Sequence, residues 1–254
     1  MHEGTGTGKV YIVGAGPGDP ELITLKGMRC LQAADVVLYD RLVDPDLLHM
    51  TRGDAERIFV GKSPACHTLP QHEINTLLIA HARQGRVVAR LKGGDPFIFG
   101  RGGEEALALA KAGIPFEIVP GVTSASAVPA YAGIPITHRG YTSTVTIVTG
   151  HEGHAPVRVN WQALAELGGT LVVLMGVKGL PYFTQSLIEA GLSPQMPAAV
   201  IQEGTTHRQR VVRGTLADIA KLAAEADLSS PAITVIGTVV SLSETLAWYQ
   251  HFHS

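Results

Sequence analysis

Short runs of apolar residues alternate with longer amphipathic segments along the whole chain. In the first half, runs rich in β-branched residues predict strands, and segments with apolar residues every three or four positions predict helices. The predicted strands are residues 10–13, 36–39, 57–60, 86–91 and 116–119, and the predicted helices are residues 22–34, 70–84 and 104–112. Most positions of these strands are apolar, which is typical of parallel strands that are buried on both faces. The alternation predicts βαβ units.

The second half repeats this alternation with a different sequence. The predicted strands are residues 144–148, 171–175, 198–201, 210–212 and 233–236, and the predicted helices are residues 124–132, 161–167, 181–190 and 216–226. Pro129 lies inside the first of these helices and argues against it. Pro120-Gly121 ends the fifth strand, and we predict an N-terminal α/β domain over residues 9–120 and a C-terminal α/β domain over residues 121–254. No long linker separates the halves, so we expect them to share a cleft.

Composition narrows the class of protein. Of the 254 residues, 45% are hydrophobic and 17% charged, and the net charge of −2 gives the chain no general attraction for nucleic acid or anionic lipid. No apolar run approaches the roughly 20 residues of a membrane span, and the first nine residues contain no signal-peptide core. Cys30 and Cys66 make neither a disulfide framework nor a zinc site. We therefore expect a cytoplasmic protein without a metal, a nucleic-acid partner or a membrane partner.

A loop rich in glycine and proline, residues 14–20 (GAGPGDP), follows the first predicted strand and precedes a helix. Dinucleotide-binding loops occupy this position, but Pro17 and Pro20 remove two N–H donors and Asp19 would repel a pyrophosphate. The loop therefore allows close approach of a ligand other than a pyrophosphate. The alternative is that this loop is a strained turn, which is needed only for folding and binds no ligand.

A second loop, residues 92–105 (KGGDPFIFGRGGEE), leads from the fourth predicted strand into a helix. Ligands of parallel sheets lie at the carboxyl ends of the strands, and Gly93 and Gly94 let a ligand approach the backbone closely. Arg101 stands at the start of the helix, where free N–H groups also favour anions. The alternative is that Arg101 and Glu104 only pair with each other on a solvated surface.

Four segments together resemble a known family. They are GAGPGDPELITLKG, VVLYDRLV, RLKGGDPFIFGRGGEE and AYAGIPITHRG, and they are similar to segments of the uroporphyrinogen-III C-methyltransferases, in the tetrapyrrole methylase superfamily. The likeness runs along nearly the whole chain. It implies two α/β domains of the tetrapyrrole methylase type with the active site in the cleft between them, and a homodimer. The additional N-terminal module of bifunctional sirohaem synthases is missing, so we expect a single-function enzyme.

The resemblance also implies roles for individual residues. Asp40 and Lys62 match positions with acid/base roles in relatives. The residues that match the site for S-adenosyl-L-methionine (SAM) are Pro17, Gly93, Gly94, Asp95, Ile98, Thr123, Ser124, Met175 and Gly204. We predict that Arg101 and Arg139 hold substrate carboxylates, because the planar guanidinium can bind two oxygens at once. Glu104 would orient Arg101 or accept a pyrrole N–H.

The implied reaction methylates uroporphyrinogen III at C2 and C7. It gives precorrin-2 through precorrin-1, releases S-adenosylhomocysteine and needs no metal, because the sulfonium of SAM supplies the driving force. The product would feed sirohaem, cobalamin or haem d1 synthesis. A ring-edge proton leaves after the attack, and the residues that would take it are Asp40, Lys62 or Arg101. Asp40 has a rival role as an acid that binds ribose hydroxyls.

Three other functions are compatible with this fold. The first is methylation of a later precorrin, and the second is methylation of RNA ribose, which the charge balance opposes. The third is a nucleotide-binding subunit without enzymatic activity.

Overall fold

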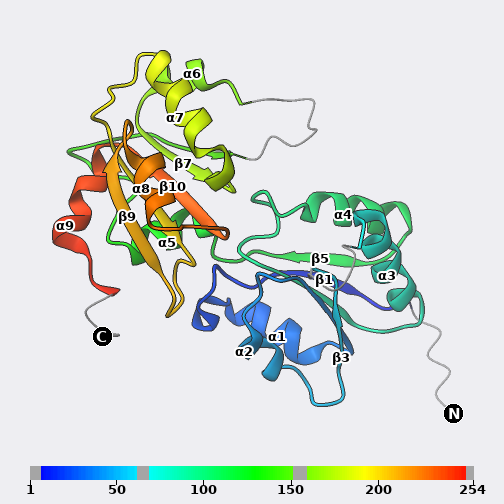
Figure 1. Cartoon of the computed structure of the whole chain (residues 1–254). Helices are drawn as coiled ribbons and strands as arrows, with labels where there is room; N and C mark the ends of the chain where they lie inside the picture. The colour runs from blue at the N-terminus through cyan, green and yellow to red at the C-terminus, as the bar shows by residue number, and fades with distance from the viewer. Residues whose placement is uncertain (1–6, 62–68, 151–158, 250–254) are drawn as a thin grey trace, which may run out of the picture. The chain divides into compact units, whose positions relative to one another are not determined.

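The computed structural model describes residues 7–61, 69–150 and 159–249. The chain divides into two compact units, Met1–Thr123 and Ser124–Ser254, and the described part of each is built around one five-stranded sheet (Figure 1). The domain boundary at residues 120–121 stays a prediction. Lys62 and Cys66 lie outside the described residues.

The sheet of the first unit is entirely parallel, as the apolar strands predict. Its strand order is β3-β2-β4-β1-β5. The strands are β1 (Val10–Gly14), β2 (Val36–Tyr39), β3 (Glu56–Phe59), β4 (Val88–Lys92) and β5 (Phe116–Val119). The α-helices are α1 (Leu25–Ala33), α2 (Pro45–His49), α3 (Gln71–Arg83) and α4 (Gly102–Lys111). Ile12 packs with residues of α3 and α4, and Val13 packs with residues of α1 and α2, so both faces of the sheet are covered.

The sheet of the second unit is mixed, with the order β6-β7-β10-β8-β9. Its strands are β6 (Val145–Thr149), β7 (Thr170–Leu174), β8 (Pro197–Gln202), β9 (Arg210–Thr215) and β10 (Ala232–Ile236). Only β6 and β7 pair in parallel, and the remaining pairs are antiparallel. The predicted alternation of strands and helices continues in this half except between β8 and β9, and its sheet is mixed. The seven-residue connection 203–209, which joins β8 to β9, is too short for a parallel crossover, so these two strands pair in antiparallel fashion.

Helices cover both faces of this second sheet. They are α5 (Ser124–Tyr131), α6 (Trp161–Leu167), α7 (Leu180–Glu189), α8 (Ile219–Glu225) and α9 (Ser243–Leu246). Residues of α6, α7 and α8 pack on one face, and α5 packs on the other through Ala125 and Val128. The predicted helix 124–132 forms as α5, although it contains Pro129. Among the described residues, no helix is both long and apolar enough to cross a membrane.

Local sequence signals explain where two helices begin. The predicted helix 22–34 is a 3₁₀ turn, Pro20–Leu22, followed by α1, because the side chain of Thr24 accepts a hydrogen bond from the N–H of Gly27 and caps α1. The short helix α2 was not predicted. It carries the corresponding signal, because Asp44 caps it and Pro45 occupies its first turn.

The carboxyl ends of three strands of the first sheet converge without side chains between them. Gly14 ends β1, and a Cβ atom at this position would lie 2.5 Å from Cα of Gly121, which follows β5. The same atom would lie 2.7 Å from the carbonyl oxygen of Gly94, which follows β4. Gly94 also exchanges backbone hydrogen bonds with Gly16, at 2.6 and 3.3 Å. The loops after β1 and β4 therefore form one rigid edge.

Replacement of Gly14 by alanine is expected to destabilise the protein by roughly 1–3 kcal/mol, because the neighbouring atoms are backbone and cannot move aside. Gly103→Ala is the matched control, since nothing lies within 4 Å of a Cβ atom at residue 103. Urea unfolding of both variants measures the difference. Equal stability of the two variants would contradict the close packing of the strand ends.

Glu117, on β5, forms ion pairs with two lysines. Its Oε1 contacts the Nζ atom of Lys26, and its Oε2 lies 2.6 Å from the Nζ atom of Lys9. The hydrogen bond with Lys26, followed by the one with Lys9, lowers the pKa of Glu117 to about 2 from an ordinary value of 4.5. These pairs connect an edge strand to the start of α1 and to the residue before β1.

The Glu117→Gln substitution is expected to lower the melting temperature at pH 7, because the folded state then loses two ion pairs. A lowered pKa stabilises the fold above the unfolded value and loses this effect as the pH falls toward the folded value. The difference from the parent protein should therefore shrink between about pH 4.5 and about pH 2. Thermal unfolding over this range checks it. Glu225→Gln, which removes a single 3.7 Å pair with Lys221, should change the melting temperature less at pH 7.

Candidate functional site

Several predicted site residues follow strands β2 and β4 at the carboxyl edge of the parallel sheet. Asp40 comes directly after β2, and Gly93, Gly94 and Asp95 come directly after β4. The carboxylate of Asp95 accepts hydrogen bonds from the N–H groups of Phe97, at 2.8 Å, and Gly121, at 3.1 Å. It therefore joins the loop after β4 to the residue that follows β5. A contact of Asp95 with the cofactor stays a prediction.

The loop between β4 and α4 is exposed and carries an unusual backbone. Phe97, Ile98 and Phe99 are 56%, 39% and 45% exposed. Phe99 and Arg101 have φ angles of 51° and 60°, in the left-handed region that non-glycine residues rarely adopt. Such strain concentrates at functional sites. Pro17 belongs to the adjacent loop after β1, since its neighbour Gly16 pairs with the loop after β4.

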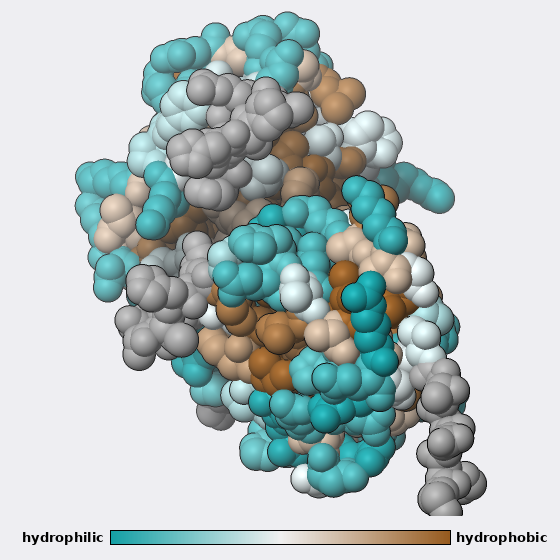
Figure 2. Space-filling model, turned by 90° about the vertical axis from the view of Figure 1, so that its right-hand side faces the viewer, coloured by the Kyte–Doolittle hydropathy of each residue, from teal (hydrophilic) through white to brown (hydrophobic). Residues whose placement is uncertain are grey.

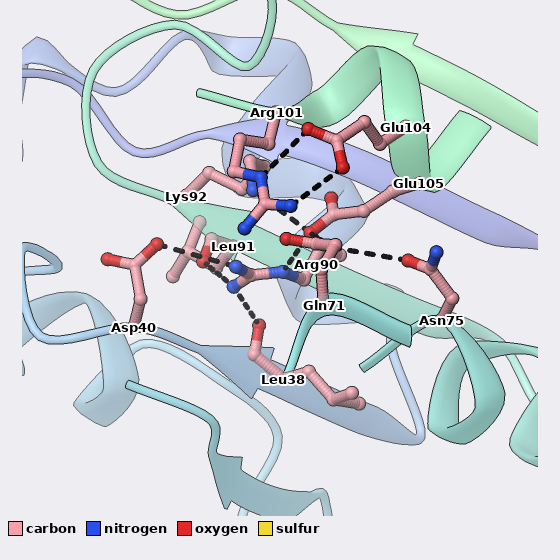
Figure 3. A network of polar contacts seen from close by, with 10 residues as sticks. All are labelled: Leu38, Asp40, Gln71, Asn75, Arg90, Leu91, Lys92, Arg101, Glu104 and Glu105. Carbon is pink, nitrogen blue, oxygen red and sulfur yellow. Dashed lines mark hydrogen bonds and ion pairs between the residues drawn. The ribbon is translucent and has the colours of Figure 1, made fainter. Parts of the chain in front are cut away.

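Arg101 and Glu104 form a two-point ion pair at the start of α4. The Nε atom of Arg101 donates to Oε1 of Glu104 at 2.8 Å, and Nη2 donates to Oε2 at 2.7 Å. Figure 3 shows the third guanidinium nitrogen directed away from Glu104. These hydrogen bonds lower the pKa of Glu104 and raise the pKa of Arg101. The pair is more than half exposed and presents an oriented cation to the solvent.

Below this pair lies a buried group of charges that the sequence analysis missed. Oε1 of Glu105 accepts hydrogen bonds from Nε of Arg90 at 3.1 Å, Nζ of Lys92 at 3.0 Å and Nε2 of Gln71 at 3.2 Å (Figure 3). The side chains of Arg90, Lys92 and Glu105 are 4%, 5% and 0% exposed. Burial, and then the charge of Arg90, lower the pKa of Lys92. The sequence signal that could have indicated this group is the pair of basic residues, Arg90 and Lys92, at alternate positions of a central strand.

Asp40 is held from two sides. Its Oδ1 atom accepts a hydrogen bond from the N–H of Leu42 at 3.0 Å, and its Oδ2 atom forms an ion pair with Nη2 of Arg90 at 3.5 Å. The side chain is 26% exposed, so solvent or a ligand reaches it. Lys62, the other predicted acid/base residue, lies outside the described residues.

In the second unit, strained residues follow two strands at the same edge. The strands β7 and β8 are both antiparallel to β10, which lies between them, so they end at one edge. Met175 comes directly after β7, is 50% exposed and has a φ of 55°. Gly204 follows β8 between Glu203 and Thr205, whose φ angles are 46° and 70°. The two predicted residues of this unit that follow strands therefore share one edge of the sheet.

Gly204 brings α5 into contact with this edge of the sheet. A Cβ atom at residue 204 would lie 2.2 Å from Cγ1 of Val128, so the loop after β8 packs directly on α5. Ser124 begins this helix, one turn before Val128, and Thr123 precedes it.

Arg139 lies elsewhere in the second unit. It stands in an exposed loop in which the N–H of Gly140 donates to Nδ1 of His138 at 3.1 Å. This loop leads into the first residue of β6, at the edge opposite to that of Met175 and Gly204. The described contacts do not bring Arg139 to the other predicted residues, and its contact with the substrate stays a prediction.

Three other features of the described residues bear on possible sites: metal binding, one pocket and the distribution of apolar residues on the surface. Residues 7–61, 69–150 and 159–249 contain no group of three or more His, Cys, Asp or Glu side chains that could hold a metal ion. A shallow pocket of about 270 Å³ is lined by Leu69, Glu73, Thr76 and Leu77, none of them a predicted site residue. Figure 2 shows one face of the molecule, where hydrophilic residues surround smaller apolar patches.

Comparison with protein families matches residues 9–220 to the tetrapyrrole (corrin/porphyrin) methylases. Among curated proteins, a siroheme synthase of Pseudomonas aeruginosa (strain UCBPP-PA14) is 54% identical over 244 residues. The match covers 96% of this chain and 52% of the siroheme synthase. The chain thus spans about half the length of the curated relatives it matches.

Two solved structures are similar over nearly their whole length. The uroporphyrin-III C-methyl transferase from Thermus thermophilus, complexed with S-adenyl homocysteine, is 42% identical, with a TM-score of 0.79 over 92% of this chain and 100% of that chain. The cobalt precorrin-4 methyltransferase CbiF is 34% identical, with a TM-score of 0.82 over 91% of this chain and 95% of that chain. The family match, the identity and the shared fold agree, and the chain therefore belongs to the tetrapyrrole (corrin/porphyrin) methylase family.

Proposed function

We propose that the protein is a SAM-dependent uroporphyrinogen-III C-methyltransferase. It methylates C2 and C7 of the substrate, giving precorrin-2 through precorrin-1, and releases S-adenosylhomocysteine. The observation that carries this proposal is the 42% identity over the full length of the Thermus thermophilus uroporphyrin-III C-methyl transferase, which was crystallised with S-adenyl homocysteine. The 54% identity with half of a siroheme synthase supports the same branch of tetrapyrrole synthesis.

The cofactor of the proposed reaction is SAM, which supplies a methyl group on a positively charged sulfur. The exposed side chains of Ile98 and Met175 offer apolar surface for the adenosine and methionine parts. We assign the contacts to two sets of residues. They are Pro17, Gly93, Gly94, Asp95, Ile98 and Thr123 in the first unit, and Ser124, Met175 and Gly204 in the second.

Arg101 is proposed to bind a carboxylate arm of the tetrapyrrole. Glu104 fixes the plane of the guanidinium through two hydrogen bonds, and the third nitrogen points away from Glu104 (Figure 3). We assign the contact with the carboxylate arm to this nitrogen. A charged hydrogen bond of this kind is about twice as strong as a neutral one. Arg139 is proposed as a second contact for the carboxylate arms.

Among the described candidates, Asp40 fits best as the group that takes the ring proton. The hydrogen bond with Glu104 raises the pKa of Arg101, so Arg101 keeps its proton and does not act as a base. The carboxylate of Asp40 is partly exposed and anchored by Leu42 and Arg90. We therefore assign the proton to Oδ2 of Asp40, with Lys62 as the alternative acceptor. A homodimer and a cytoplasmic location stay predictions.

Incubation with SAM and enzymatically prepared uroporphyrinogen III is expected to give a product with two added methyl groups. Mass spectrometry of the oxidised products counts them. A folded protein that binds SAM and adds no methyl group to this substrate would contradict the proposal.

The 34% identity with the cobalt precorrin-4 methyltransferase CbiF supports a second candidate, methylation of a later precorrin. The same assay with cobalt precorrin-4 distinguishes the two functions. One added methyl group there, and none on uroporphyrinogen III, would favour the second candidate.

Arg101→Ala is expected to raise the KM for uroporphyrinogen III about tenfold or more, because one charged carboxylate contact is lost. The affinity for SAM should stay within about twofold, which calorimetric titration measures. Arg52→Ala is the control, since Arg52 is also an exposed arginine that pairs with carboxylates, those of Asp35 and Asp54. Equal effects of the two substitutions would show that Arg101 is a surface ion pair only.

A further inference from the structure

The side chain of Arg90 is an exception in the parallel sheet. It lies in β4, which has β2 on one side and β1 on the other, and only 4% of it is exposed. Apolar residues usually occupy such positions. A buried ion network is often no more stable than apolar residues of similar volume. The position of this arginine therefore points to a role beyond stability of the fold.

The guanidinium of Arg90 contacts three elements of the first unit (Figure 3). Its Nε atom donates to Oε1 of Glu105 in α4, at 3.1 Å. Its Nη1 atom donates to the carbonyl oxygens of Leu38 in β2, at 3.4 Å, and Leu91 in β4, at 2.9 Å. These contacts fix the plane of the guanidinium. The remaining nitrogen, Nη2, is thereby directed to Oδ2 of Asp40, at 3.5 Å.

The carboxylate of Asp40 is consequently fixed through both oxygens. Oδ1 accepts the N–H of Leu42, in the turn that follows β2, while Oδ2 faces Arg90. A carboxylate held at one oxygen only can rotate about its bond to Cβ. The ion pair with Arg90 opposes this rotation and stabilises a negative charge at the end of β2.

We propose that Arg90 is a positioning residue for the methylation reaction, and that it acts through Asp40. It holds Oδ2 of Asp40 in the orientation in which this atom accepts the ring proton. The inference rests on the proposed function and on the assignment of the proton to Asp40. The side chain of Arg90 is only 4% exposed, so its proposed role is exerted through Asp40 and not by contact with the substrate.

The contacts of Glu105 make a selective test possible. If Arg90 is replaced by methionine, Oε1 of Glu105 still has Nζ of Lys92 and Nε2 of Gln71 as donors. The substitution therefore removes the partner of Asp40 without leaving the buried Glu105 unpaired. Gln71→Met is the matched control, because it removes another donor to the same oxygen and leaves Arg90 and Asp40 in place.

The experiment is a double-mutant cycle of Arg90→Met and Asp40→Asn in the full chain, with kcat for methylation of uroporphyrinogen III as the readout. We expect Arg90→Met to lower kcat about tenfold or more, with the KM for SAM changed less than about twofold. On the Asp40→Asn background, it should lower kcat by less than about twofold, because the residue through which it acts is already altered. Gln71→Met should have the same small effect on both backgrounds.

Two results would overturn the inference. One is an equal loss of kcat from Arg90→Met on both backgrounds, which would make Arg90 a stabilising residue only. The other is an unchanged kcat in Asp40→Asn. If Arg90→Met does not fold, as judged by circular dichroism, Arg90→Lys replaces it in the cycle, since lysine keeps the charge but cannot make all these contacts. Parent protein that methylates no tetrapyrrole would remove the proposed function and this inference together, whereas an active parent with an additive cycle removes the inference alone.

Discussion

One buried oxygen atom, Oε1 of Glu105, organises the carboxyl edge of the parallel sheet. It accepts hydrogen bonds from a helix residue, Gln71, and from two strand residues, Arg90 and Lys92. Two like charges at alternate positions of one strand would repel each other in a dry interior, and the carboxylate between them makes their burial possible. Removal of one member of such a buried pair typically costs about 3–5 kcal/mol. The loops that follow β2 and β4 start from side chains and backbone fixed by this group of charges.

Both units contain left-handed non-glycine residues in segments that follow strands. In the first unit the left-handed residues Phe99 and Arg101 follow β4, and in the second Met175 follows β7 and Glu203 follows β8. The two sheets share this feature although their topologies differ, since one is parallel and the other is mixed. Rigid packing below these residues, such as that of Gly204 on Val128, compensates for the strain. The proposed methyl transfer needs such rigidity, because the reacting atoms must be held roughly 3–3.5 Å apart.

Periodicity located strands well where polar residues bound the apolar run. The run Val36–Tyr39 forms a strand with the predicted bounds, since its neighbours on both sides are polar or small. The same run-based reasoning could not give the direction of β10, because a strand buried on both faces has the same pattern in parallel and antiparallel pairs. For the candidate site, the glycine-rich segments and the family resemblance indicated that the loops 14–20 and 92–105 take part. The hydrogen bonds of Asp95 and the ion pair of Arg90 depend on residues distant in sequence, so no local pattern predicts them.

The pairing of Arg101 with Glu104 has a consequence for the thermodynamics of recognition. A free arginine side chain loses much of its rotational entropy when a ligand immobilises it. Here two hydrogen bonds within the first turn of α4 restrict that rotation before any ligand arrives. The ordering penalty therefore belongs to folding, and a larger share of the contact energy remains available for the proposed binding of a carboxylate by Arg101.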